Sequence, residues 1–186
     1  NGRFQIQESS GETMEVDGVV LAVPARIAAQ IIRPVSQKAA NILEQIRYAS
    51  VATALIAYPL DAVRGVKALS GTGLLVPSTR GRLLKAATFL TTKWSHLADP
   101  NYFLMRLSSG RADEGEIEKL EDSALVAGLH SDLVAATGIS SEPVQYFVQR
   151  WPHAIPQLEI GHLHLVAQVR QELELQPGVM IAGSSY

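Results

Sequence analysis

The order of the secondary-structure elements that the sequence predicts constrains the fold more than any other feature. Residues 1–46 give strands followed by helices, and residues 47–149 give several strands followed by helices. Residues 150–186 then give a helix and a buried strand. Strands alternating with helices are typical of an α/β unit, whereas runs of strands followed by runs of helices are typical of an α+β unit. We therefore predict a mixed α+β and α/β fold, in which an α+β unit is inserted between two pieces of an α/β unit.

The first segment predicts a hairpin, a buried strand and two helices. Residues 4–7 and 12–16 alternate polar and apolar side chains around a Ser-Ser-Gly turn, as hairpin strands do. The continuous apolar run over residues 19–23 favours a strand that is covered on both faces. Pro24 stands at a plausible first position of the following helix. A second helix is indicated by apolar residues at helical spacing: Ala39, Ile42, Leu43 and Ile46.

The middle segment predicts a sheet and then helices. Four strands are expected, over residues 50–58, 71–77, 86–91 and 102–107, in an antiparallel or mixed sheet. Asp113 and Glu116 make a capping box for a helix that extends through Leu125. A separate helix is expected over residues 131–137, before Gly138.

The last segment begins at an aromatic corner. A strand over residues 143–149 is expected to end at Arg150-Trp151, where Pro152 and Pro156 frame a stiff loop. A helix over residues 163–173 follows, and a buried strand begins at Val179. Trp151 has two interpretations at this stage, since an aromatic at a strand end either packs in the core or forms one wall of a site for a flat ligand.

Composition and charge exclude several classes of protein. The chain has 186 residues, a net charge of -2 and a pI near 6.2, so it has no strong field for nucleic acid. It contains no cysteine, which excludes disulfides and thiolate metal sites and is typical of a reducing cytoplasm. No apolar run approaches the roughly 20 residues that a membrane span requires.

No catalytic motif stands out. His162 and His164 lie two residues apart on a predicted helix, so they point in different directions and make poor metal geometry. The sequence lacks a Gly-x-Ser-x-Gly elbow. Gly71-Thr72-Gly73 has no third glycine for a dinucleotide loop, so it is either a plain bend or a place where something approaches the backbone closely. We predict neither a metal site nor a catalytic side chain in this chain.

Four segments, in order, resemble the oxygen-dependent protoporphyrinogen and coproporphyrinogen oxidases. Residues 71–78 resemble the glycine-rich strand of that family, and residues 91–96 are similar to its Ser/Thr-Lys-Trp segment. Residues 150–162 resemble its Arg-Trp…Pro-Gln-Tyr…Gly-His stretch, with Leu158 in place of the usual tyrosine. Residues 179–186 resemble the strand and turn that lead to its C-terminal flavin-binding glycines.

The resemblance implies a domain plan and a set of site residues. Residues 1–46 and 150–186 would form part of an FAD-binding domain of the amine-oxidase-like type, and residues 47–149 an inserted substrate-binding domain. Trp151 would contact the flavin. The substrate pocket would include four residues: Gly73, Leu75, Thr88 and Leu107. The family's N-terminal glycine motif and a membrane-associating helical region have no counterpart here, so we expect a piece of a longer protein.

The implied activity is FAD-dependent oxidation of protoporphyrinogen IX or coproporphyrinogen III to the porphyrin, with oxygen as the acceptor, in haem biosynthesis. A cytoplasmic location is expected, and peripheral membrane contact through the helical region absent here stays open. Two alternatives also stay open. One is another amine-oxidase-like flavin oxidoreductase, and the other is a folded fragment without activity of its own.

Overall fold

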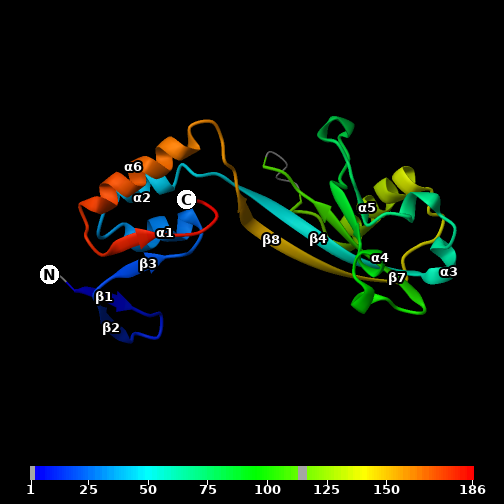
Figure 1. The fold of residues 1–186 in the computed structure, drawn as a ribbon, viewed down its shortest axis with the longest axis horizontal. Coiled ribbons are helices and arrows are strands. Elements are labelled where there is room, and N and C mark those ends of the chain that lie inside the picture. The colour runs from blue at the N-terminus through cyan, green and yellow to red at the C-terminus, as the bar shows by residue number, and fades with distance from the viewer. Residues whose placement is uncertain (1–2, 113–116) are drawn as a thin grey trace. The chain divides into compact units, whose positions relative to one another are not determined.

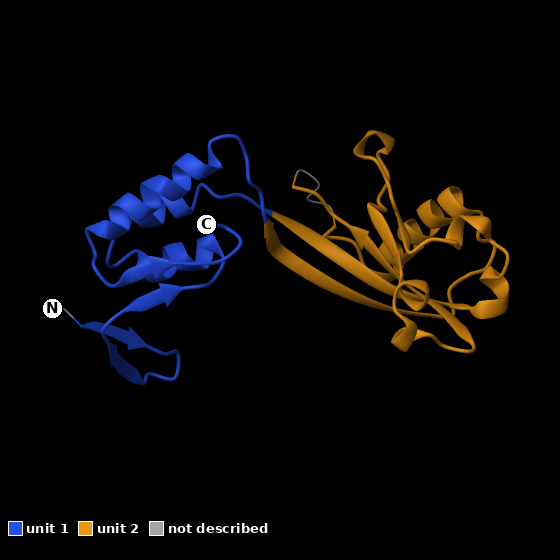
Figure 2. Ribbon diagram, viewed as in Figure 1, with its two compact units in different colours: residues 1–48, 156–186 blue, residues 49–155 orange. Residues whose placement is uncertain are grey.

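The computed structural model describes residues 3–112 and 117–186, and the chain divides into two compact units (Figure 2). Unit 1 comprises residues 1–48 and 156–186, and unit 2 comprises residues 49–155. The chain enters unit 2 along strand β4 (Tyr48–Pro59) and leaves it along strand β8 (Gln145–Pro156). The functional roles expected for the two units stay predictions.

Unit 1 contains a hairpin, a parallel strand pair and three helices (Figure 1). Its elements are β1 (Phe4–Gln7), β2 (Thr13–Val16), β3 (Val19–Leu21), α1 (Ala25–Ile32), α2 (Gln37–Leu43), α6 (His162–Glu174) and β9 (Val179–Ile181). β1 and β2 pair antiparallel, which confirms the predicted hairpin. β3 and β9 pair in parallel, with Val19 opposite Val179 and Leu21 opposite Ile181.

Small and aliphatic side chains form the core of unit 1. Ala25, Ala28 and Ala29 of α1 are fully buried, so the helix can lie close to its neighbours. Leu43 of α2 and Val169 of α6 are buried in the same cluster. The prediction that the strand after residue 18 is covered on both faces is wrong for the described residues, because Val20 is 56% exposed.

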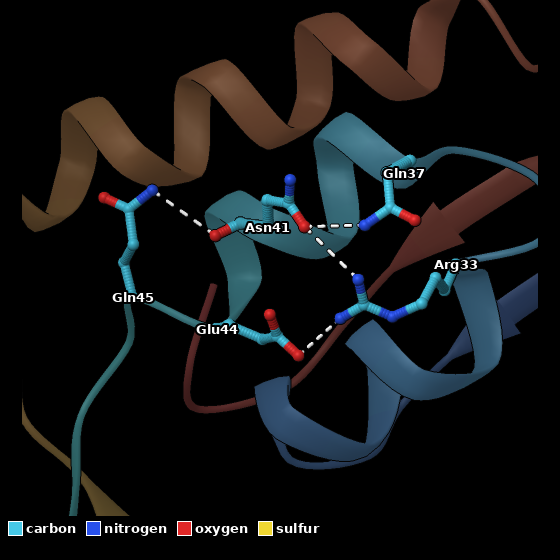
Figure 3. A network of polar contacts seen from close by, with 5 residues as sticks. All are labelled: Arg33, Gln37, Asn41, Glu44 and Gln45. Atoms are coloured by element: carbon cyan, nitrogen blue, oxygen red, sulfur yellow. Dashed lines mark hydrogen bonds and ion pairs between the residues drawn. The ribbon is translucent and has the colours of Figure 1, made fainter.

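A polar network joins the end of α1 to α2 (Figure 3). The Arg33 guanidinium donates to Asn41 Oδ1 at 3.2 Å and pairs with the Glu44 carboxylate. Gln37 Nε2 donates to the same Asn41 oxygen at 2.7 Å, and Gln45 Nε2 donates to the Asn41 carbonyl at 3.3 Å. These groups are exposed, so each contact contributes little to stability, and the network chiefly fixes the turn after α1.

Unit 2 is a five-stranded sheet with the strand order β5-β6-β7-β4-β8. Besides β4 and β8 it contains α3 (Leu60–Val63), β5 (Gly73–Leu75), β6 (Ala86–Phe89), α4 (Leu90–Lys93), β7 (Tyr102–Ser109) and α5 (Asp122–Thr137), with 3-10 turns at Lys67–Leu69, Ser78–Arg80 and Ser95–Leu97. The pairs β5–β6, β6–β7 and β7–β4 are antiparallel. The predicted strand over residues 71–77 is therefore real but shorter than expected.

One face of this sheet carries the core of unit 2. Ala54, Ile56 and Tyr58 alternate along β4 and are fully buried, as is Leu107 of β7. They pack with Leu129 and other buried residues of α5 in a single cluster. Because successive strand residues point to opposite faces, the residues between them lie on the other face.

The helix predicted from Asp113 through Leu125 is wrong over residues 117–121, which form turns. Its last part joins the helix predicted over residues 131–137 in a single helix, α5, which ends at Gly138 in the left-handed conformation (φ 76°). The helix continues through Gly128, although glycine weakens helices. A Cβ at this position would lie 2.7 Å from the Leu83 side chain, so glycine lets the helix pack closely against Leu83. The predicted capping box of Asp113 and Glu116 lies outside the described residues.

The prediction that a strand ends at Trp151 is wrong, since β8 continues through both prolines to Pro156. β8 is an edge strand, where proline is tolerated because no ladder N–H is required on the open side. Two backbone hydrogen bonds bracket the pairing of β4 with β8: the Val144 N–H donates to the Ala57 carbonyl, and the Gln157 N–H donates to the Arg47 carbonyl. The chain advances 13 residues between these bonds on the β8 side and 10 on the β4 side, so β8 must bulge. His153, at φ 47°, marks one irregular position.

A buried tyrosine joins the sheet to α5. The Tyr58 hydroxyl lies 2.7 Å from His130 Nδ1, and His130 Nε2 lies 3.2 Å from the Glu142 carboxylate. A carboxylate only accepts, so Nε2 carries a proton and donates to Glu142, while Nδ1 and the Tyr58 hydroxyl share the other hydrogen bond. Burial, and to a lesser extent Glu142, raises the pKa of Tyr58 far above its ordinary value of 10.0.

This contact predicts a loss of stability in alkali. A raised pKa means that the folded state retains the Tyr58 proton, so its contribution is complete below pH 10 and is lost as pH rises from there. We expect the free energy of unfolding to fall above pH 10, and to fall less steeply in Tyr58→Phe. Urea unfolding between pH 7 and 11 measures both slopes, and equal slopes would contradict the assignment.

Candidate functional site

The first candidate site lies at the carboxyl ends of β3 and β9 in unit 1. The Ala182 N–H donates to the Leu21 carbonyl at 3.1 Å, which extends the parallel pairing by one bond. The chain then turns through Gly183, whose carbonyl accepts from the Tyr186 N–H at 3.2 Å. Both strands therefore deliver loops to the same sheet edge, where open α/β sheets bind nucleotides.

Two tyrosines hold these loops together. The Tyr48 hydroxyl accepts from the Ala25 N–H at 2.7 Å, at the start of α1, and is hydrogen-bonded to Ser185 Oγ. The Tyr186 hydroxyl donates to the Val23 carbonyl at 3.0 Å. Burial, followed by the influence of Tyr48, raises the pKa of Tyr186 to about 12, so the Tyr186 phenol is a neutral donor near neutral pH.

The turn between these anchors is open. Gly183 has φ 129°, and a Cβ built there would meet no heavy atom within 4 Å among the described residues. A ligand can therefore approach the backbone of the turn directly. This edge has the form that a dinucleotide such as FAD requires, with two strand ends, a helix start and an accessible glycine turn.

The second candidate site is the face of the unit 2 sheet opposite its core, which we call the open face. Its positions follow from the pairing, because residues directly opposite each other share a face. Gly73 lies opposite Thr88, Thr88 opposite Arg106, and Arg106 opposite Leu55. Leu75 lies two residues beyond Gly73 and on the same face.

The open face exposes large apolar side chains. Leu75 is 84% exposed and Leu55 is 40% exposed. On β8, Val148 packs against the core and Arg150 bonds to the Leu120 carbonyl on the core side. The alternate residues of that strand lie on the open face, and two of them are exposed aromatics: Phe147 and Trp151. Exposed aromatic and aliphatic groups gathered on one face are typical of a binding surface.

The structure brings together three of the four substrate residues expected from sequence. Gly73, Leu75 and Thr88 share the open face. Leu107 does not join them, because it is fully buried on the core face. Sequence reasoning missed Arg106, which lies on the open face beside Thr88. The alternation of apolar and other residues over 102–107 was the available signal in the sequence. It shows that Arg106 and Leu107 lie on opposite faces, but only the strand register shows which face is the open one.

The structure also resolves the question raised by the glycines of residues 71–73. A Cβ on Gly73 would lie 2.3 Å from the Ala87 carbonyl oxygen and 3.3 Å from Thr88 Cα. The close approach is therefore made by the neighbouring strand β6. The glycine allows β5 to pair there and leaves a flat patch on the open face.

The comparisons with known proteins show the family and the fold of this chain. The chain belongs to the flavin-containing amine oxidoreductase family, whose model matches residues 2–186. It is 33% identical to coproporphyrinogen III oxidase of Mycobacterium leprae over 97% of this chain and 38% of that protein. It is 30% identical to chloroplastic protoporphyrinogen oxidase 1 of Arabidopsis thaliana, over 87% of this chain and 31% of that protein.

Solved structures support the flavin-binding fold. A structure from Exiguobacterium sp. 255-15, named as a candidate protoporphyrinogen oxidase, matches with a TM-score of 0.85 and 26% identity, over 100% of this chain and 40% of that chain. Reduced UDP-galactopyranose mutase matches with a TM-score of 0.72 and 16% identity, over 95% of this chain and 37% of that chain, which is a likeness of fold.

The chain spans about 38% of the length of the coproporphyrinogen III oxidases that it matches. In the part of the chain that the structure describes, no helix is both long enough and apolar enough to cross a membrane. The same residues contain no cluster of three or more side chains suited to a metal ion.

Proposed function

We propose that this chain is part of a longer FAD-dependent oxidase that converts a porphyrinogen to the porphyrin with oxygen as acceptor, in haem biosynthesis. The observation that carries the proposal is the open face of unit 2, a flat sheet surface with exposed Leu75, Phe147 and Trp151. A porphyrinogen is a broad, largely apolar macrocycle, and such a surface can cover one side of it. The names of the similar proteins support the same activity.

Unit 1 would hold part of the FAD. The turn at Gly183, with open space beside its backbone, would lie against the dinucleotide, and Tyr48 and Tyr186 would keep that turn at the strand edge. FAD, when bound, supplies the chemistry by accepting a hydride from the substrate and passing the electrons to oxygen. The protein's part is to bind, orient and exclude water.

Unit 2 would hold the substrate, as a domain inserted into the FAD-binding domain. Gly73 would provide the flat patch, while Leu75 and Thr88 would contact the macrocycle. None of these side chains is an acid or a base that could move a proton at neutral pH. The proposal therefore assigns them to substrate placement and names no catalytic residue in this chain.

The test is an oxidation assay on the full-length protein with FAD. Reduced coproporphyrinogen III and protoporphyrinogen IX are supplied separately, and porphyrin fluorescence is followed above the autoxidation blank. We expect growth of fluorescence, and the faster substrate identifies the enzyme. A flavin-bound protein that oxidises neither would favour another amine-oxidase-like activity. The isolated chain, run beside it, is expected to show no activity.

We also propose that Trp151 contacts the flavin, since it is half exposed and lies on a surface with other aromatic groups. Trp151→Ala in the full-length protein should weaken FAD retention about tenfold or more, because a stacked aromatic would be lost. Trp94→Ala is the matched control, since Trp94 is the chain's other tryptophan and is stacked by Lys93 at 4.7 Å. FAD dissociation followed by fluorescence measures both, and an unchanged affinity in Trp151→Ala would refute the contact.

A further inference from the structure

The open face carries an unexpected charge on an interior strand of the sheet. Arg106 lies in β7, the middle strand of the five, between Thr88 on one side and Leu55 on the other. Its neighbours along β7 on the same face are Leu104 and Ser108. A guanidinium therefore stands on the middle strand of the open face, among neighbouring side chains that are apolar or small: Thr88, Leu55, Leu104 and Ser108.

Arg106 differs in its partners from most of the other arginines of unit 2. Arg82 pairs with Asp132 at 3.1 Å, Arg150 pairs with Asp122, and Arg111 donates to the Val76 carbonyl at 3.2 Å. Within the described residues, the Arg106 side chain makes no hydrogen bond or ion pair. Nor does any aspartate or glutamate occupy an open-face position among the described strand residues of this sheet.

An unpaired cation on this surface has a physical consequence. When a flat apolar ligand covers the open face, it removes water from the guanidinium, and an isolated buried charge is strongly unfavourable. The cost is offset only if the ligand brings an anion to the same place. A carboxylate is well matched, because guanidinium binds it through two parallel hydrogen bonds.

We propose that Arg106 anchors a carboxylate of the substrate and thereby fixes the orientation of the macrocycle on the open face. This inference rests on the proposed function and adds a specificity-determining residue to it. Coproporphyrinogen carries four propionate groups and protoporphyrinogen carries two, all at the rim of an apolar ring. Arg106 binds one propionate, and Gly73 and Leu75 contact the ring beside it.

The experiment compares a carboxylate ligand with its ester in the full-length protein. Coproporphyrin III and its tetramethyl ester are titrated, in the same low concentration of detergent, against the wild type, Arg106→Met and Arg106→Lys, and binding is read from porphyrin fluorescence. Arg64→Met is the control, since it removes the same charge from an exposed pair with Asp61 at 3.2 Å. Thermal unfolding of each variant verifies folding.

We expect Arg106→Met to raise Kd for the free acid by about tenfold to a hundredfold, while Kd for the ester changes less than about twofold. Arg106→Lys should fall between, because lysine keeps the charge and loses the paired geometry. Arg64→Met should match the wild type. Equal changes for acid and ester would overturn the inference, and so would no change for either.

The same experiment separates failure of this inference from failure of the proposed function. A wild-type protein that oxidises porphyrinogens, but whose Arg106→Met variant treats acid and ester alike, refutes only the anchor. A wild type that neither oxidises nor binds a porphyrin refutes both. If Arg106→Met lowers the unfolding temperature of the full-length protein without separating acid from ester, the guanidinium pairs with another segment of the chain, and the anchor is refuted.

Discussion

Gly73→Ala is expected to abolish most of the porphyrinogen oxidation in the full-length protein. The added Cβ would lie 2.3 Å from the Ala87 carbonyl oxygen, which is backbone and cannot swing away. β5 must then move away from β6, and Leu75 moves with it. A displacement of about 1 Å at a substrate-positioning surface costs on the order of a hundredfold in rate, so kcat/KM should fall at least that far.

Gly71→Ala is the matched control for this prediction. It lies two residues away, and its added Cβ would have only the Gly73 carbonyl oxygen nearby, at 3.9 Å, which is an ordinary contact. Its free energy of unfolding should stay within about 0.5 kcal/mol of the wild type, and its kcat/KM should stay close to the wild-type value. Because β5 is a short edge strand, Gly73→Ala should lower the free energy of unfolding by only about 1–3 kcal/mol. Equal activities of the two variants would show that the β5–β6 contact does not shape the site.

The sequence predicted most elements because their local patterns were strong. The hairpin of residues 4–16 alternates regularly, and the helix before Pro177-Gly178 has a clear apolar stripe, so both were placed closely. The errors have local causes. β8 was ended too early, since prolines usually break strands, whereas an edge strand with bulges accommodates them.

The candidate site was predicted only where the resemblance supplied residues. It indicated Gly73, Leu75 and Thr88, which the register then placed on one face. It could not separate them from Leu107, because the face of a strand residue depends on a pairing register that composition does not reveal. Arg106 was missed for the same reason, since an arginine in a strand has meaning only once its neighbours across the sheet are known.

Gly110→Ala is expected to destabilise unit 2 more than Gly73→Ala or Gly71→Ala. Gly110 has φ 106°, and its Cβ would lie 2.4 Å from the Ser50 carbonyl oxygen and 2.9 Å from Val51 Cα. It follows directly after β7, whose pairing with β4 begins at Ser109 opposite Ala52. Both strands are interior to the sheet, so neither can yield without opening the core. The free energy of unfolding should fall by about 3 kcal/mol or more.

Gly65→Ala separates the two causes of this loss. Gly65 also has a positive φ, of 82°, but its Cβ would meet nothing within 4 Å among the described residues, so only backbone strain remains. That strain is worth about 1–2 kcal/mol. Urea unfolding of the two variants should therefore differ by about 1 kcal/mol or more, with Gly110→Ala the less stable. If the two losses are equal, the backbone of β4 moves to accommodate the added methyl group. The pairing of β4 with β7, which places Arg106 beside Leu55, would then be less rigid than the short distances at Gly110 indicate.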